Sequence, residues 1–405
     1  MYKRQTFQWG ISAVQIAAVS ATGNTSGNSV TATGADNYGQ LMTISGTGSL
    51  VVSTDSSSPS YAIVAGGSSV TVGAFKLRAT NESINLNRIG LKLTNTASSS
   101  ASDLVQVQLQ VGGVTIGTAT FVGSNTNATS TLTSPLALAR DTDVVVTVKA
   151  DLANIGTSQP GVTGHVIAVD VDTNNTNTQG SGAQSGASVN ASGSTAVAGV
   201  RLFKSFPVLA KAAVPTNTLN NGTQTLLRFT VTANSKGDVG VGKVTLRMAT
   251  TTASVTDVNV YAYTDSSYST PVSGLRSDGA LLATDILATG NATWVSSATD
   301  LNVVASTPVQ VPASGVRYFE VRGTVAGAAT GASVQTSFQG DAAYPAHAAS
   351  TYDDTLTNID SDTNDDFIWS PNTTGTSVVG DPDWTNGFGL IGLPSSNMAA
   401  EVLSK

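Results

Sequence analysis

Apolar and polar residues alternate along much of this chain, and one alternating segment occurs twice. The copies are Phe75–Leu93 and Phe229–Met248. After one inserted residue, five apolar positions correspond at a constant spacing: Ile84, Leu86, Ile89, Leu91 and Leu93 match Val239, Val241, Val244, Leu246 and Met248. Apolar residues mostly two apart predict β-strands with one buried face. Each copy therefore predicts a strand, a polar turn and a second strand laid back on the first.

The correspondence continues beyond this segment. Pro135–Leu152 matches Pro308–Val325 at a larger spacing, which predicts an insertion between Asp265 and Ala298 in the second copy. Further short strands are separated by turns rich in Gly, Asn and Ser. The predicted strands are 49–53, 69–79, 84–93, 104–111, 114–121, 136–139, 144–150 and 164–171, and then 202–209, 223–233, 240–248, 255–263, 303–311, 316–325 and 333–338.

These strands predict an all-β protein made of tandem immunoglobulin-like antiparallel β-sandwiches with an irregular C-terminal extension. The Gly112–Gly113 pair predicts a tight hairpin between two of the strands. The expected divisions are residues 46–199 for the first repeat, 200–348 for the second and 349–405 for an acidic linker and aromatic tail. Residues 1–45, with a predicted strand at Ser12–Val19, read as the last part of a truncated earlier repeat, and residues 1–5 resemble a translated sequencing adaptor.

Composition narrows the classes of function. Only 11% of the residues are charged, against about 25% in ordinary globular proteins, and such sparse charge is common in secreted β proteins. The net charge of −7 leaves no basic stripe for phosphates, so we expect no nucleic-acid partner. The chain contains no cysteine, so each domain depends on its hydrophobic core. No apolar run is long enough to predict a membrane span.

The last part of the chain has a different texture. It contains FIWS at Phe367–Ser370, DWTNG at Asp383–Gly387 and LP at Leu393–Pro394. This tail resembles the C-terminal end of large secreted surface proteins of ultrasmall, reduced-genome bacteria, in which tandem immunoglobulin-like repeats precede such a tail. The resemblance implies an extracellular, cell-surface location and implies no established activity.

One candidate metal site precedes this tail. Oxygen ligands at alternate positions suit a hard cation such as Ca²⁺, and four residues have this spacing: Asp360, Asp362, Asn364 and Asp366. Asp365 replaces the Gly of a helix–loop–helix calcium loop and Pro371 replaces its Glu, so a solvated acidic linker is the interpretation that the spacing favours. A weaker version occurs at Asp170, Asp172 and Asn174, where the end of an exposed strand explains the residues better.

No motif in the sequence identifies a class of enzyme. The two histidines, His165 and His347, lie far apart in the chain, and neither a nucleophile elbow nor metal-hydrolase spacing is present. The tail gathers four large aromatic residues in a chain with few of them: Phe367, Trp369, Trp384 and Phe388. These side chains could form a small separate core, anchor the tail on the last sandwich or stack on a sugar.

The sequence therefore predicts a non-enzymatic extracellular structural protein, such as a stalk, a surface-layer segment or a cell-wall coat. Its partners would be like domains of the same or neighbouring chains. An alternative is an adhesin module in which the long segments 172–195 and 265–298 bind carbohydrate or a host-cell protein. Another alternative is a non-catalytic accessory part of a secreted hydrolase.

Overall fold

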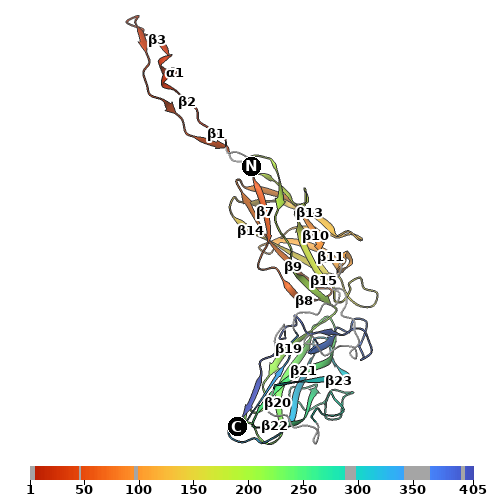
Figure 1. Cartoon of the computed structure of the whole chain (residues 1–405). Coiled ribbons are helices and arrows are strands. Elements are labelled where there is room, and N and C mark those ends of the chain that lie inside the picture. The colour runs from red at the N-terminus through yellow and green to blue at the C-terminus, as the bar shows by residue number, and fades with distance from the viewer. Residues whose placement is uncertain (1–4, 45–46, 95–98, 288–297, 342–364, 394–396) are drawn as a thin grey trace.

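The computed structural model describes residues 5–44, 47–94, 99–287, 298–341, 365–393 and 397–405 (Figure 1). Nearly all of the regular structure in these residues is β, which confirms the all-β prediction. Figure 1 shows two β-sandwiches that follow one another along the molecule, with a thin arm extending from the first. The C-terminus lies on the second sandwich, at the end remote from the arm.

The first sandwich contains residues 49–203. One sheet has the order β12-β11-β14-β9-β7. Its strands are β7 (Ser49–Thr54), β9 (Ser69–Thr80), β11 (Leu104–Val111), β12 (Val114–Ala119) and β14 (Asp143–Leu152). The facing strands are β8 (Ser60–Ala65), β10 (Ile84–Thr94), β13 (Asn127–Leu138), β15 (Val166–Asp172), β16 (Gln179–Gly182), β17 (Ser188–Ser192) and β18 (Gly199–Phe203). The β16–β17 hairpin joins β10 to β7, so the two sheets are continuous along this edge.

The second sandwich uses the same strand order. One sheet is β19 (Pro207–Ala212), β20 (Gly222–Ala233), β24 (Val316–Ala326) and β22 (Ser254–Tyr263). It corresponds to β7-β9-β14-β11 of the first sandwich. The central strand of the other sheet is β21 (Val239–Thr251). On one edge it pairs with β23 (Thr299–Val311), and on the other with β25 (Ser333–Phe338) and β26 (Phe367–Ser370). In the same way, β10 of the first sandwich pairs with β13 on one edge and with β15 and β16 on the other.

The repeated segment occupies equivalent buried positions. Phe75 of β9 is opposite Val146 of β14, and Phe229 of β20 is opposite Phe319 of β24. Both phenylalanines are 0% exposed. All ten apolar positions matched in β10 and β21 are also buried, so the period of two identified the core faces correctly. The Gly112–Gly113 hairpin is confirmed as well, because Val111 pairs Val114 and both glycines have positive φ.

The prediction that the second strand of each copy folds back on the first is wrong. β9 pairs β7 and β14, whereas β10 pairs β13, β15 and β16 in the opposite sheet. The turn between them holds Glu82, whose buried carboxylate accepts bonds from the backbone N–H groups of Gly48, Gln184 and Ser185. These bonds tie the turn to two other segments, so the chain crosses between the sheets there instead of forming a hairpin.

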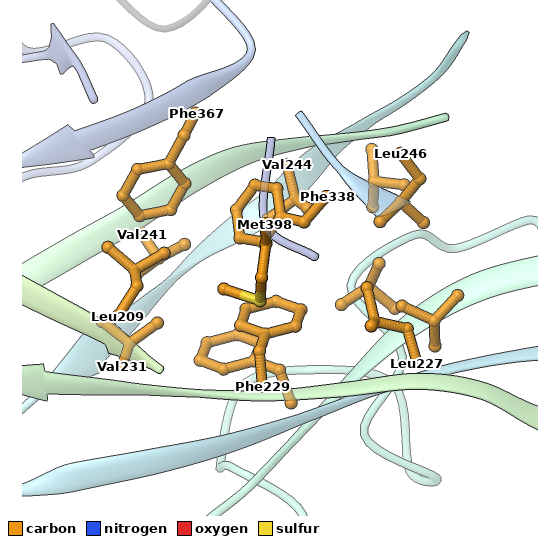
Figure 2. Close-up of a cluster of buried hydrophobic side chains, with 14 of the residues drawn as sticks. Leu209, Leu227, Phe229, Val231, Val241, Val244, Leu246, Phe338, Phe367 and Met398 are labelled. Carbon is orange, nitrogen blue, oxygen red and sulfur yellow. The ribbon is translucent and has the colours of Figure 1, made fainter. Parts of the chain in front are cut away.

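The tail supplies strands and core residues to the second sandwich. β26 pairs β21, β27 (Thr385–Asn386) pairs β26, and β28 (Glu401–Ser404) pairs β25. The expected division at residue 348 thus separates strands that share one sheet. Figure 2 shows Phe367 and Met398 among side chains of β20 and β21. The Phe338 ring lies 4.8 Å from Phe229 and 5.5 Å from Phe367, so these parts of the chain share one core.

The arm is a narrow two-stranded ribbon of residues 5–44. Its pairs are β1 (Gln5–Phe7) with β6 (Met42–Ile44), β2 (Gly10–Ile11) with β5 (Asn37–Tyr38), and β3 (Ser20–Thr22) with β4 (Ser29–Thr31). The strand predicted at Ser12–Val19 is wrong, because Ala13–Ala17 forms the short helix α1. Ser12 and Gln15 form a capping box at its start. This capping box stabilises α1 through contacts within residues 12–15.

Candidate functional site

The predicted calcium residues fall largely outside the described part of the chain. Asp360, Asp362 and Asn364 lie in a segment that is not described. Asp366 is described, and its backbone takes part in strand pairing, since its carbonyl accepts a bond from Thr245 N at 2.8 Å. Burial raises the pKa of Asp366 to about 6. Among the described residues, no group of three or more His, Asp or Glu side chains is arranged to hold a metal ion.

The weaker acidic motif forms a local turn. Asp172 accepts a bond from the backbone N of Asn174 at 3.0 Å and from Asn177 Nδ2 at 2.6 Å. In the adhesin alternative the long segment 172–195 that follows is a binding loop, but residues 179–182 and 188–192 of it form β16 and β17 within the sandwich. It therefore offers less free loop than the adhesin alternative expected.

A buried carboxylate that the sequence analysis did not single out holds the tail in place. Asp341 Oδ1 accepts a bond from Asp366 N at 2.6 Å, and Oδ2 accepts bonds from Gly387 N at 2.6 Å and Phe367 N at 3.4 Å. The Asp341 side chain is completely buried. Burial raises the pKa of Asp341 to about 7, although the three N–H donors oppose this shift. No periodic pattern in the sequence identifies this residue.

The aromatic tail residues form the junction between the two sandwiches. Trp369 is completely buried, its ring lies 4.9 Å from Phe203 of β18, and its Nε1 donates to Asn386 O at 2.8 Å. The Phe388 ring lies 5.0 Å from Tyr61 of β8. Phe203 and Ala65 of the first sandwich belong to the same hydrophobic cluster as Phe229 in the second. Of the three roles considered for these aromatics, anchoring describes Trp369, because its buried ring cannot stack on a sugar.

Polar contacts reinforce this junction. Lys204 Nζ donates to Asn372 O at 2.7 Å, and Lys236 Nζ donates to Gly67 O at 2.7 Å. Asn372 Nδ2 in turn donates to Asp238 Oδ2 at 2.7 Å, so the FIWS segment is tied to the second sandwich where it meets the first. The contacts at the junction are therefore both apolar and hydrogen-bonded.

The DWTNG segment is hydrogen-bonded to the FIWS strand and to the residues that follow it. Asp383 accepts bonds from Ser370 Oγ at 2.9 Å, from the backbone N of Thr373 at 2.8 Å and from Ser377 Oγ at 3.0 Å. Trp384 is buried against Ile368. The residues that gave the tail its recognisable sequence thus have structural roles, because they fold it onto the second sandwich.

A second candidate site is the inserted segment 264–287 of the second sandwich. It follows the outer edge of β22 through bridges of Tyr261 with Ala280 and of Tyr263 with Pro271. Arg276 within it donates to Asp278 and Asp285 at 2.7 Å each. The segment therefore covers an edge strand and carries an ordered charge cluster.

Under this segment lies an arginine–tyrosine network centred on Glu320. This buried carboxylate is paired with Arg228, at 2.7 Å, and with Arg322. The Arg228 guanidinium lies 3.8 Å from the centre of the Tyr268 ring, and that of Arg322 lies 4.7 Å from the Tyr261 ring. Burial raises the pKa of both tyrosines above the ordinary value of about 10, at which a tyrosine is already neutral at pH 7. Every charge named here has an opposite charge beside it.

A small pocket opens beside this network. Its volume is about 320 Å³, close to the lower limit for small-ligand sites. The lining residues are Gly274, Leu275, Arg276, Ala280, Leu281, Ala283, Ser306 and Thr307. A guanidinium, two hydroxyl groups and an apolar wall can contact a small neutral ligand that bears hydroxyl groups. They provide no nucleophile paired with a general base.

His165 is the one histidine that the structure describes, and its ring contacts a buried carboxylate. His165 Nδ1 lies 2.8 Å from Asp103 Oδ2. Asp103 also accepts bonds from the backbone N of Ser100 and of Val162, next to the 3₁₀ turn Ala101–Asp103. His347 lies outside the described residues. The contacts of Asp103 connect loops of the first sandwich, which is a structural role.

Comparisons with known proteins add little to this description. No family model matches the sequence, and no curated protein matches it. Among solved structures, the chain is similar to the C-terminal domain of the AgI/II polypeptide BspA of Streptococcus agalactiae, at 9% identity and a TM-score of 0.20, over 71% of this chain and 95% of that one. It is also similar to the serine-rich repeat adhesion glycoprotein Srr1 of Streptococcus agalactiae, at 12% identity and a TM-score of 0.18, over 72% and 90% of the two chains.

A third similar structure is a putative membrane-anchored protein of Corynebacterium diphtheriae, at 8% identity and a TM-score of 0.18, over 98% of this chain and all of that one. Such low TM-scores carry no argument about the role of this chain. In the described residues, no helix has the length and apolar character needed to cross a membrane. The case for a function therefore depends on the contacts described above.

Proposed function

We propose that this chain is a non-enzymatic structural segment of an extracellular, cell-surface protein, in which two β-sandwiches form a rigid stalk. One observation supports this role above the others: Phe203 of the first sandwich packs against Trp369 within the core of the second. Domains joined by an exposed linker move relative to one another, whereas a large apolar contact restrains them. The contact makes the angle between the sandwiches a property of the fold.

The surface supports the same role. Solubility depends on Ser, Thr, Asn and Gln, because only 11% of the residues are charged. A surface with few charges offers little electrostatic attraction to charged molecules. The edge of β22 is covered by the inserted segment, and β19 is bonded at its edge through Leu209 N to Ile391 O at 2.9 Å. Covered edges limit unwanted strand pairing between neighbouring molecules.

Small-angle X-ray scattering tests the rigidity. The test variant combines Phe203→Ala, Phe388→Ser and Lys236→Ala, which removes contacts across the junction, that of Phe203 with Trp369 among them. The control is Lys211→Ala, which removes a bond to Ala400 O of 2.8 Å inside the second sandwich. We expect the native chain and the control to fit one rigid shape, and the test variant to require a range of inter-sandwich angles. A native chain that already samples many angles would contradict the proposal.

The adhesin alternative has one specific observation in its favour, the pocket of about 320 Å³ beside Arg276. A glycan array with the native chain tests it. Ala283→Trp fills the pocket, whereas Thr284→Trp adds the same bulk at an exposed neighbouring position outside its lining. Binding that Ala283→Trp abolishes and Thr284→Trp preserves would support an adhesin. Absence of any glycan binding leaves the stalk as the better description.

A further inference from the structure

The second sandwich buries a lysine against an aspartate. Lys243 Nζ of β21 lies 2.9 Å from Asp365 Oδ2, and the two side chains are 6% and 7% exposed. Such residues are seldom buried to this degree, because a charge loses its hydration when it leaves water. Ile368 lies opposite Lys243 on β26 and is buried with Trp384, so residues of the tail cover this face of the sheet.

The first sandwich has a different arrangement at the corresponding position. In the repeated segment Arg88 of β10 corresponds to Lys243, and the strand register shifts just before each of them. A bulge of this kind redirects the side chains next to it. The Arg88 guanidinium donates to Thr176 O at 2.8 Å and to Gln179 Oε1 at 2.9 Å, which are neutral oxygens. The second sandwich therefore replaces a guanidinium facing neutral groups by an amine facing a carboxyl group.

We propose that Lys243 and Asp365 condense to an amide, which joins β21 covalently to the beginning of the tail. The Lys243 nitrogen forms a bond with Cγ of Asp365, and the bond between Cγ and one carboxyl oxygen breaks. Two of the three ammonium protons pass to that oxygen, which leaves as water, and the third remains on the amide nitrogen. The reaction takes up no other reactant, and no atom is oxidised or reduced.

The burial and the contact distance favour this reaction over its course in water. Within the buried pair, one proton can pass from nitrogen to oxygen, and the resulting amine and acid are neutral groups that are less costly to bury than two ions. Groups held in contact react as parts of one molecule, with effective concentrations of roughly 10⁵–10⁸ M when they are well oriented. The amide product carries no charge, so the reaction removes both buried charges from the core.

Asp366 is placed to carry the protons of this step. The charges of Lys243 and of Asp365 both act on its carboxyl group. Its backbone is held on two sides, because its carbonyl accepts a bond from Thr245 N at 2.8 Å and its N–H donates to Asp341 Oδ1 at 2.6 Å. A carboxyl group in this position can take a proton from the attacking nitrogen and give one to the leaving oxygen.

Cleavage at methionine tests the bond in the full chain. Cyanogen bromide in denaturant cuts after Met248, which lies between Lys243 and Asp365, so these two residues fall in the fragments 43–248 and 249–398. We expect the native chain to give the two fragments as one joined product, lighter by one water than their sum. Lys243→Arg, which copies the first sandwich, should give separate fragments. Separate fragments from the native chain, or a joined product from Lys243→Arg, would overturn the proposal.

Tandem mass spectrometry of the joined product identifies the linked residues directly, and a link at any pair other than Lys243 and Asp365 contradicts the assignment. The matched control is Lys211→Arg, which alters a lysine 3.0 Å from Glu401 in a more exposed pair and should leave the joined product unchanged. Asp366→Asn should slow the joining at least about a hundredfold, so that freshly purified protein gives mostly separate fragments. A folded Asp366→Asn that is fully joined at purification would refute the role of Asp366.

Discussion

Replacing the buried Asp341 by Asn should change how the stability of the second sandwich depends on pH. Burial raises the pKa of Asp341 to about 7, whereas an Asp in an unfolded chain has a pKa of about 3.9. The folded state therefore holds this proton more tightly. Its stabilising contribution is complete below pH ~4 and is lost as pH rises through about 7. The difference of about three pKa units corresponds to roughly 4 kcal/mol.

Asn stays neutral throughout this range. Its amide nitrogen must face one of the three N–H groups that Asp341 now receives, which costs about 1–3 kcal/mol at every pH. The free energy of unfolding of the native chain minus that of Asp341→Asn should therefore decrease between pH 4 and pH 8 by roughly 4 kcal/mol. Carboxyl groups remote from Asp341 titrate in both proteins and cancel in this difference, and an Asp366→Asn background removes the neighbouring carboxylate whose charge also raises the pKa of Asp341.

Urea denaturation at several pH values provides the measurement, with tryptophan fluorescence as the signal. Trp369 and Trp384 are buried in the tail and report its release. A Trp9→Phe background removes the emission of the exposed arm residue. A difference that stays constant with pH, or increases, would show that the three N–H donors outweigh burial and that Asp341 is ionised across the range.

Three further changes test other parts of the fold. In urea denaturation, Gly392→Ala should lower the free energy of unfolding by at least about 2 kcal/mol, because Gly392 has a φ of +88° and the added Cβ would lie 1.8 Å from the backbone oxygen of Leu209. The control Gly380→Ala should be neutral, because its Cβ meets nothing within 4 Å. Glu320→Gln should cost about 1.5–3 kcal/mol, because it leaves two partly buried guanidinium groups facing a neutral amide. The control Arg247→Gln removes an exposed pair worth about 0–1 kcal/mol. The Ser185 hydroxyl and backbone N–H groups lower the pKa of Glu82 to about 2. The ionised Glu82 therefore stabilises the fold above pH ~4.5, and this stabilisation is lost as pH falls through about 2. In acid denaturation, the stability of Glu82→Gln should not show this dependence on pH.

The local pattern of the sequence predicted the buried faces of several strands and one of the turns. The period of two identified the core faces of β9, β10, β20 and β21, because every second side chain of a strand points to the same face whatever its neighbours are. The Gly112–Gly113 turn was readable for a similar reason, since positive φ at two successive positions favours glycine. Both features depend on residues adjacent in sequence.

The candidate sites were less predictable. The aromatic tail was visible as a cluster, but Asp341, which holds it, has no pattern and acts through backbone groups of residues 366, 367 and 387. Glu320 was likewise hidden within a strand that alternates normally. Buried charges such as these are identified by their partners, and their partners are distant in sequence.

The sequence by itself determined which residues are buried in strands and where several turns occur, because these depend on backbone geometry and on the spacing of apolar side chains. Only the tertiary structure decided which strands become neighbours. It placed β9 and β10 in opposite sheets through the contacts of Glu82, and it added β26 and β28 to the second sandwich. The helix Ala13–Ala17 has a local origin in the capping box of Ser12 and Gln15, which the apolar spacing did not reveal. A strand needs hydrogen bonds from a partner elsewhere in the chain, and no local pattern specifies that partner.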